Sequence, residues 1–217
     1  MVTDLMTDPH DAWPEAACQP ELFIEFANRL KLSSAGAPAG PDDVATLRSW
    51  LTAHGLLKGR TADARLVQDV PAFRELRTLV RGIAARVDHG KAPTGRQVSA
   101  INRVMRDGLH YHALRATDGD RHFSMEPVGD ELQQARATVA GSLAHYLADH
   151  DEHRLGVCAD ETCGWLFIDE SPAGRRRWCD MRTCGNRAKV ARHRARARQA
   201  PTISATPPAQ SAVASRQ

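Results

Sequence analysis

Residues 158–189 read CADETCGWLFIDESPAGRRRWCDMRTCGNRAK, and their cysteines set the architecture of the C-terminal part of the chain. Four of the five cysteines lie here, in the pattern Cys158-x4-Cys163-x15-Cys179-x4-Cys184. Two cysteine pairs, each on a tight turn, bracket a stretch long enough for one β-hairpin, which is typical of four thiolates around one tetrahedral zinc ion. Because four thiolates fill the coordination sphere, we expect one structural Zn²⁺ rather than a catalytic one.

Other interpretations of these cysteines are two disulfides, an iron–sulfur cluster, or four unrelated thiols. Disulfides are rare in a reducing compartment, and the cysteine count alone leaves an iron–sulfur cluster open, although such clusters usually show tighter spacings. The local density of cysteines is too high to arise by chance. The remaining cysteine, Cys18, stands alone and is expected to have no role.

Aromatic residues accompany the cysteines. Trp165 and Trp178 lie inside the segment, next to the apolar run Leu166–Ile168. We expect them to form a miniature core that excludes water from the sulfur atoms. So small a unit buries too little surface to fold alone, so zinc binding should supply folding free energy on the order of 10 kcal/mol.

A basic segment follows the cysteines. Of the 29 Lys and Arg residues, ten lie between 171 and 199, against one acidic residue, Asp180, in a chain of net charge only +3. From about Thr183 to Gln199, Ala, Arg, Lys and Gln dominate, which predicts a helix. An acidic body with one basic segment indicates a polyanionic partner for that segment.

The basic residues of this helix form two stripes at helical spacing. Arg187, Arg194 and Arg198 fall on one side, and Lys189, Arg192 and Arg196 fall on the opposite side. Since both stripes cannot pack on a core, the helix should project toward solvent or a nucleic-acid groove. The alternative is a solvated cationic helix end. The predicted DNA-contacting residues are Arg175, Arg176, Arg177, Arg187, Lys189, Arg192, Arg194, Arg196 and Arg198.

The residues before 150 predict a helical bundle with one small hairpin. The expected helices cover 20–32, 42–55, a segment that Pro71 opens, a segment that the Thr94–Gln97 capping box opens, and about 129–150. The sequence Asp118-Gly119 predicts a hairpin between two short strands. His110 and His112 are expected to be surface residues. The bundle shows no catalytic constellation, so an enzyme is not expected.

Composition supports this organisation. At 42% hydrophobic and 25% charged residues, the chain is neither disordered throughout nor a coiled-coil rod. The chain shows no run of about 18 consecutive apolar residues and no secretory signal. We therefore expect no membrane association and a cytoplasmic, nucleoid-associated location. The fold class is mainly α, and the expected domains are an N-terminal arm (1–19), a helical domain (20–153), a zinc-stapled, treble-clef-like hairpin and helix (154–199) and a disordered tail (200–217).

The stretch Cys158–Arg198 resembles a CGNR zinc finger. The matching residues are Cys158, Cys163–Asp169, Arg176–Cys179, Met181 and Cys184–Lys189, and Cys184–Arg187 spell the name. In bacterial proteins this finger follows an ABATE domain, a stress-induced transcription regulator module. Its opening resembles Leu22–Arg29, Leu47, Trp50, Leu51, Leu76 and Arg77, although the family often has Asp and Thr where Glu25 and Arg29 stand. The resemblance implies zinc on the four cysteines, DNA binding and transcriptional regulation.

Structural roles are expected for Gly185 and Asn186, as for Trp165 and Trp178. The Asn186 side chain could bond a backbone group or a zinc-bound sulfur, and Arg187 could reach a phosphate or brace the strand bearing Asp169. The function that the sequence predicts is a zinc-dependent DNA-binding transcription regulator, whose helical domain senses a small-molecule signal or forms a homodimer. The alternative is a zinc-stapled protein-interaction or RNA-binding module.

Overall fold

The computed structural model describes residues 19, 21–30, 32, 40–59, 61–117, 120–149 and 154–199. Cys18, the other residues of the expected arm before residue 19, and the expected tail 200–217 lie outside these ranges. The chain divides into two compact units, residues 1–179 and residues 180–217. The domain limits expected from the sequence stay a prediction.

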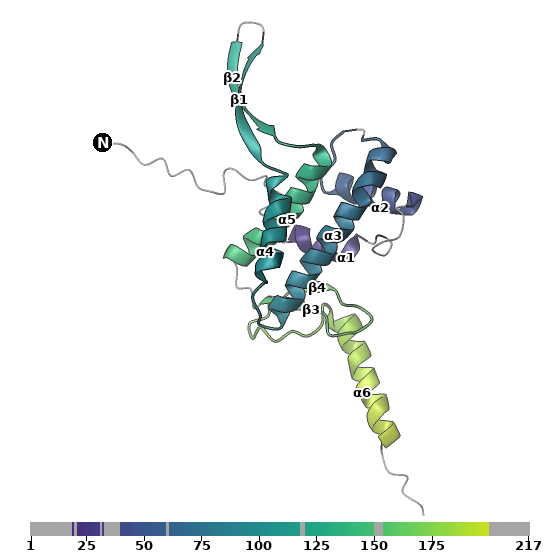
Figure 1. Ribbon diagram of the computed structural model, residues 1–217. Coiled ribbons are helices and arrows are strands. Elements are labelled where there is room, and N and C mark those ends of the chain that lie inside the picture. Colours follow the sequence, from purple (N-terminus) through teal and green to yellow (C-terminus); the bar gives the residue numbers. More distant parts are fainter. Residues whose placement is uncertain are drawn as a thin grey trace, which may run out of the picture. The chain divides into compact units, whose positions relative to one another are not determined.

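The first unit holds five helices and two antiparallel strand pairs within the described residues (Figure 1). The helices are α1 (Glu21–Arg29), α2 (Pro41–Ala53), α3 (Asp63–Asp88), α4 (Gly95–Arg106) and α5 (Glu131–Asp149). The strands are β1 (His110–Thr117), β2 (Asp120–Pro127), β3 (Leu155–Val157) and β4 (Leu166–Ile168). The mainly helical fold class predicted from the sequence is confirmed.

Aromatic side chains join the helices of the core. The ring centroids of Phe23 on α1 and Tyr146 on α5 are 5.6 Å apart, and Phe26 packs edge-on against Trp50 of α2 at 5.4 Å. Phe26 also lies 6.3 Å from Phe73 of α3. Because helical spacing placed all five rings on buried faces, the periodicity identified the core correctly.

Helix α4 begins as its capping signal predicts. The Thr94 hydroxyl accepts from the Gln97 N–H at 3.2 Å, and the Gln97 carboxamide accepts from the Thr94 N–H at 2.8 Å. On this helix Ile101 is buried, whereas Val98 is 46% exposed. The N-cap of α2 is Gly40, whose N–H donates to the Asp43 carboxylate at 3.1 Å.

Helix α3 begins earlier than the sequence predicted. Pro71 does not open it; the helix begins at Asp63 and Pro71 lies in its interior. The helical spacing continues upstream through Leu66 and Val70, which are both fully buried. Burial of this extra length therefore outweighs the cost of an interior proline, about 3 kcal/mol.

The predicted hairpin is confirmed and is longer than expected. Strands β1 and β2 pair antiparallel from His110↔Pro127 to Thr117↔Asp120, and the turn residues 118–119 lie outside the described ranges. The hairpin extends away from the helices of the first unit (Figure 1).

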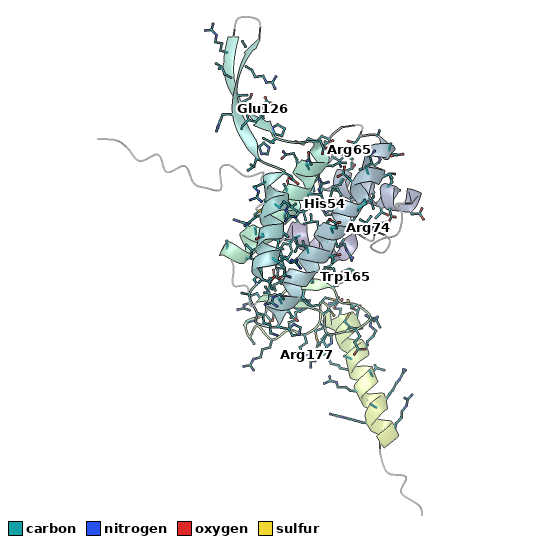
Figure 2. All side chains as sticks on the ribbon, in the orientation of Figure 1. His54, Arg65, Arg74, Glu126, Trp165 and Arg177 are labelled. Atoms are coloured by element: carbon teal, nitrogen blue, oxygen red, sulfur yellow. The ribbon has the colours of Figure 1, made fainter. Side chains whose placement is uncertain are left out.

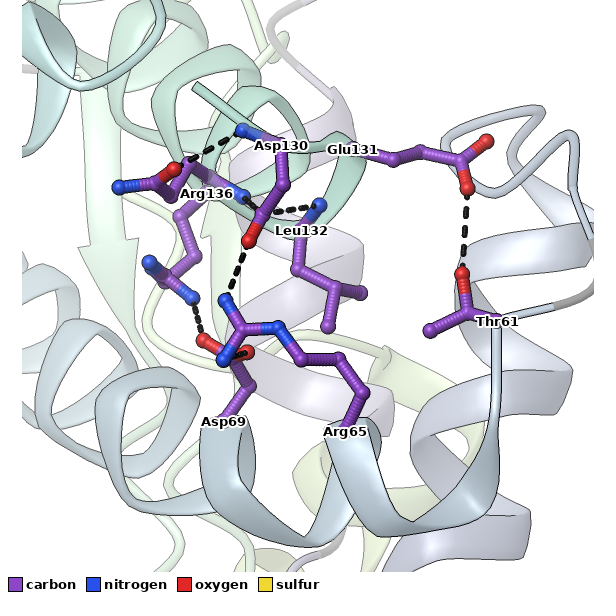
Figure 3. A network of polar contacts seen from close by, with 8 residues as sticks. Thr61, Arg65, Asp69, Asp130, Glu131, Leu132 and Arg136 are labelled. Carbon is purple, nitrogen blue, oxygen red and sulfur yellow. Dashed lines mark hydrogen bonds and ion pairs between the residues drawn. The ribbon is translucent and has the colours of Figure 1, made fainter.

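An ionic network that the sequence did not predict joins α3 to α5 (Figure 3). The Asp69 carboxylate is buried and meets both Arg136 and Arg65, and Arg65 also donates to Asp130. Burial alone would raise the pKa of Asp130, but hydrogen bonds from the Gln133 N–H and from Arg65 outweigh it and hold the pKa below its ordinary value. Within this network Asp69 and Arg136 are buried, whereas Arg65 and Asp130 are each 43% exposed. Removing Arg136 would leave the buried Asp69 charge with less compensation, which is destabilising.

The second unit is described from Asp180 to Gln199. It contains a π-helical turn, η4 (Met181–Gly185), followed by α6 (Asn186–Gln199), so the helical region begins slightly before the predicted Thr183. The Asp180 carboxylate accepts from the Arg182 N–H at 2.7 Å and caps this turn. Across the described ranges, no helix has both the length and the apolar character that crossing a bilayer requires.

Candidate metal centre

The first cysteine pair lies on a hydrogen-bonded turn. The Cys163 N–H donates to the Asp160 carbonyl at 2.8 Å, and the Asp160 carboxylate accepts from the N–H and the hydroxyl of Thr162 at 3.0 and 2.7 Å. Gly164 leaves the turn with φ +59°, a conformation that side chains other than glycine's rarely adopt. The four-residue gap thus closes one compact turn that presents both thiols.

The third cysteine is held by Arg176. The Arg176 guanidinium donates to the Trp178 carbonyl at 2.8 Å and to the Cys179 carbonyl. It also lies 5.2 Å from the centroid of the Phe167 ring. This packing places the Cys179 sulfur 3.6 Å from the Cys163 sulfur. Arg176 therefore braces the loop that carries Cys179.

The fourth cysteine, Cys184, lies on η4 and is 2% exposed. The Arg187 guanidinium donates to its sulfur at 3.1 Å. The sequence analysis suggested such a bond for Asn186, but the Asn186 side chain is exposed and makes no hydrogen bond among the described residues. A Cβ at Gly185 would lie 2.9 Å from the Met181 sulfur, and the structural role expected for this glycine stays a prediction.

The sulfur atoms of the four cysteines all lie within 4.8 Å of one another. Zn–S bonds of about 2.3 Å in a regular tetrahedron require sulfur–sulfur separations of about 3.8 Å, close to the 3.6 Å between Cys163 and Cys179. A disulfide would need about 2.05 Å, and all four described cysteines are free thiols. The donor set therefore fits one zinc ion, and the four cysteines form a candidate zinc site.

The helices of the first unit hold the strands that carry this site. The Asn28 side chain donates to the Leu166 carbonyl and accepts from the Leu166 N–H, both at 2.8 Å. Arg81 donates to the Gly164 carbonyl at 2.6 Å, and the Asp88 carboxylate accepts from the Val157 N–H at 3.1 Å. Leu166 also belongs to the helical core. The thiol-bearing loops of this unit are thus fixed to α1 and α3.

Asp169 organises the loop after β4. Hydrogen bonds from Ser171, then from the Arg176 N–H at 2.7 Å, lower the pKa of this carboxylate below its ordinary value. Arg154 braces the same loop through the carbonyls of Asp169 and Ser171, at 3.1 and 2.6 Å.

The aromatic residues only partly form the miniature core that we expected. Phe167 and Leu166 are buried, but Trp165 is 41% exposed. The residues of β4 that pack on the helical core are Leu166 and Ile168. Arg177 lies over the Trp178 ring at 5.4 Å. Sequence reasoning gave no indication of the contacts from Asn28, Arg81 and Asp88.

The predicted DNA-contacting residues differ in how far they are free. Arg176 and Arg187 bond within the site, and Arg177 stacks on Trp178, as described above. The others are exposed and have no hydrogen bond or ion pair among the described residues: Arg175, Lys189, Arg192, Arg194, Arg196 and Arg198. Figure 2 shows side chains leaving more than one side of α6.

Paired short strands, four clustered thiols and a helix after the last thiol define a zinc-finger protein. Residues 154–197 match the CGNR zinc finger, and residues 21–150 match ABATE, described as "Putative stress-induced transcription regulator". Because the second match covers more than half of the chain, the protein belongs to the ABATE family and carries a CGNR zinc finger. The resemblance inferred from the motifs is thus confirmed. No curated protein matches the chain at a significant level.

Proposed function

We propose that this protein is a zinc-dependent regulator of transcription that binds duplex DNA through α6. The observation that carries the proposal is the set of exposed, unpaired cations from Lys189 to Arg198 on a helix that directly follows the fourth thiol. A concentrated positive charge without internal partners favours a polyanion. The family descriptions support regulation of transcription as the setting.

The dimensions of α6 suit a DNA groove. Its 14 residues span about 21 Å at 1.5 Å per residue, and the major groove is about 12 Å wide. Alanines separate the cations of α6 and let the backbone approach closely. Arginine contacts to phosphates give affinity and salt dependence, whereas sequence choice needs contacts to base edges.

We assign Cys158, Cys163, Cys179 and Cys184 as the four ligands of one structural zinc. When bound, the ion supplies a cross-link among the turns that carry these residues. The N–H that Arg187 donates to Cys184 offsets part of the negative charge that four thiolates bring to the site. We assign no catalysis to this site, since it offers no open coordination position.

The helical body is proposed to receive a small-molecule signal or to form a homodimer, in a protein that works at the nucleoid of a bacterial cytoplasm during stress. Its separate core, distant in sequence from α6, supports a sensory or assembly role.

A salt titration tests DNA binding. Anisotropy of a labelled duplex should show affinity that falls steeply with salt. The variant Arg192→Ala/Arg194→Ala/Arg196→Ala should lower the slope of log K against log[salt] by about 2.7 if all three contact phosphates. The matched control removes three exposed arginines of α4, Arg96, Arg103 and Arg106, and should leave the slope unchanged.

The same assay decides between partners. An unchanged slope in the α6 variant eliminates this helix as the contact. Preference for structured RNA over duplex DNA at fixed salt favours the RNA-binding alternative. Absence of binding to any nucleic acid at low salt favours the protein-interaction alternative.

A further inference from the structure

A pocket of about 460 Å³ lies in the first unit, away from the cysteines. It forms where α2 ends, where the β1–β2 hairpin joins the helices and where α5 begins. Its volume falls in the range of small-molecule sites, about 300–1,000 Å³. The lining residues are His54, Gly55, Leu56, Lys58, His110, Pro127, Gly129, Glu131, Gln134, Ala135 and Thr138.

Most polar groups of the pocket are already engaged. Both ring nitrogens of His54 face oxygen atoms, the Trp50 carbonyl at 2.8 Å and the Glu25 carboxylate at 3.1 Å. The carboxylate of Glu131 accepts from the N–H groups of Lys58 and Gly59. It also accepts from the Thr61 hydroxyl (Figure 3). These three hydrogen bonds direct the negative charge of Glu131 toward the loop that carries Lys58, Gly59 and Thr61.

Two basic side chains remain unpaired at the pocket. Among the described residues, neither the Lys58 ammonium nor the His110 imidazole has a hydrogen bond or an ion pair. Leu56, Pro127 and Ala135 supply apolar wall between and around them. The pocket thus combines the Lys58 ammonium and an imidazole N–H with apolar surface, which is the complement of an organic anion.

We propose that this pocket binds a small monocarboxylate with an apolar body. Its carboxylate accepts from Lys58 and His110, and its apolar part covers Leu56, Pro127 and Ala135. The inference rests on the sensory role proposed for the helical body, and it names the class of signal.

A ligand in this pocket contacts several elements of the first unit. His110 and Pro127 are the paired residues at the base of the hairpin, so a ligand that contacts both fixes that base. The Glu131 end of α5 lines the same pocket and holds the loop after α2. Ligand binding thus ties three elements together.

Protein-observed NMR on the full-length zinc-loaded chain tests the proposal, with sodium hexanoate as the probe and hexanamide as its uncharged match. Hexanoate should shift the amides of Gly55, Leu56, Gly129 and Ala135 in a saturable way. Hexanamide should bind about tenfold more weakly, because its neutral carbonyl accepts weaker hydrogen bonds than a carboxylate does.

A lysine variant and its control complete the test. Lys58→Met should reduce hexanoate affinity about tenfold while leaving hexanamide unchanged. Lys91→Met, at an exposed lysine outside the pocket, should change neither. Equal binding of the two probes, shifts spread over other surfaces, or an unaffected Lys58→Met variant would each overturn the proposal. Because the readout is occupancy of the pocket, such a failure leaves DNA binding by α6 standing.

Discussion

Replacing Asn28 by alanine should destabilise the thiol-bearing strands, although Asn28 lies 138 residues from its partner. Its side chain is buried and makes both hydrogen bonds with Leu166, each at 2.8 Å. The substitution leaves a buried N–H and a buried carbonyl without partners. At about 1–3 kcal/mol for each of the two groups, the free energy of unfolding should fall by about 2–6 kcal/mol.

Thermal and urea unfolding of the zinc-loaded protein measure this change. Each kcal/mol corresponds to about 2–4 °C for a chain of this size, so Tm should fall by at least about 4 °C and by at most about 24 °C. Competition with a coloured chelator should also show earlier zinc release, because the Trp165 carbonyl next to Leu166 accepts from the Cys158 N–H at 2.8 Å. The matched control is Asn102→Ala, an exposed asparagine on α4.

A change below about 0.5 kcal/mol in Asn28→Ala, equal to an ordinary surface substitution, would refute this reasoning. It would mean that β4 keeps its position without the side chain from α1. A loss of stability without any earlier zinc release would show that the helices stabilise the strand but not the metal centre.

Two further changes test the local physics. Asp169→Asn should lower stability at neutral pH, because hydrogen bonds from Ser171 and the Arg176 N–H stabilise the ionised carboxylate and lower its pKa. The difference from wild type should begin to shrink below about pH 4 and disappear as pH falls through the lowered pKa of the folded state. Unfolding curves from about pH 2.5 to 7 measure this, and a difference that stays constant below about pH 4 would contradict it. Pro71→Ala should raise the free energy of unfolding by about 1–3 kcal/mol by removing a proline from the interior of α3, and a loss of stability in urea would show that its ring contributes packing instead.

Local signals in the sequence predicted much of the fold. The Thr94–Gln97 capping box fixes the start of α4, since both partners lie within four residues of each other. The start of α3 was missed because the rule that places proline in a first turn is local. The burial of Leu66 and Val70 that overrides it depends on the tertiary core.

The candidate site divides in the same way. The cysteine spacing predicted the cluster, and the bond from Arg187 to Cys184 spans only three residues, so helical spacing could have revealed it. The clamp from Asn28 to Leu166 has no such signal, because an asparagine on a helix face gives no indication of a strand more than a hundred residues away.

The direct test of the metal centre is X-ray absorption at the zinc edge on the protein as purified. The account predicts one zinc per chain with four sulfur neighbours at about 2.3 Å. A protein without zinc, or a zinc ion with nitrogen or oxygen in place of any of the four sulfurs, would contradict it.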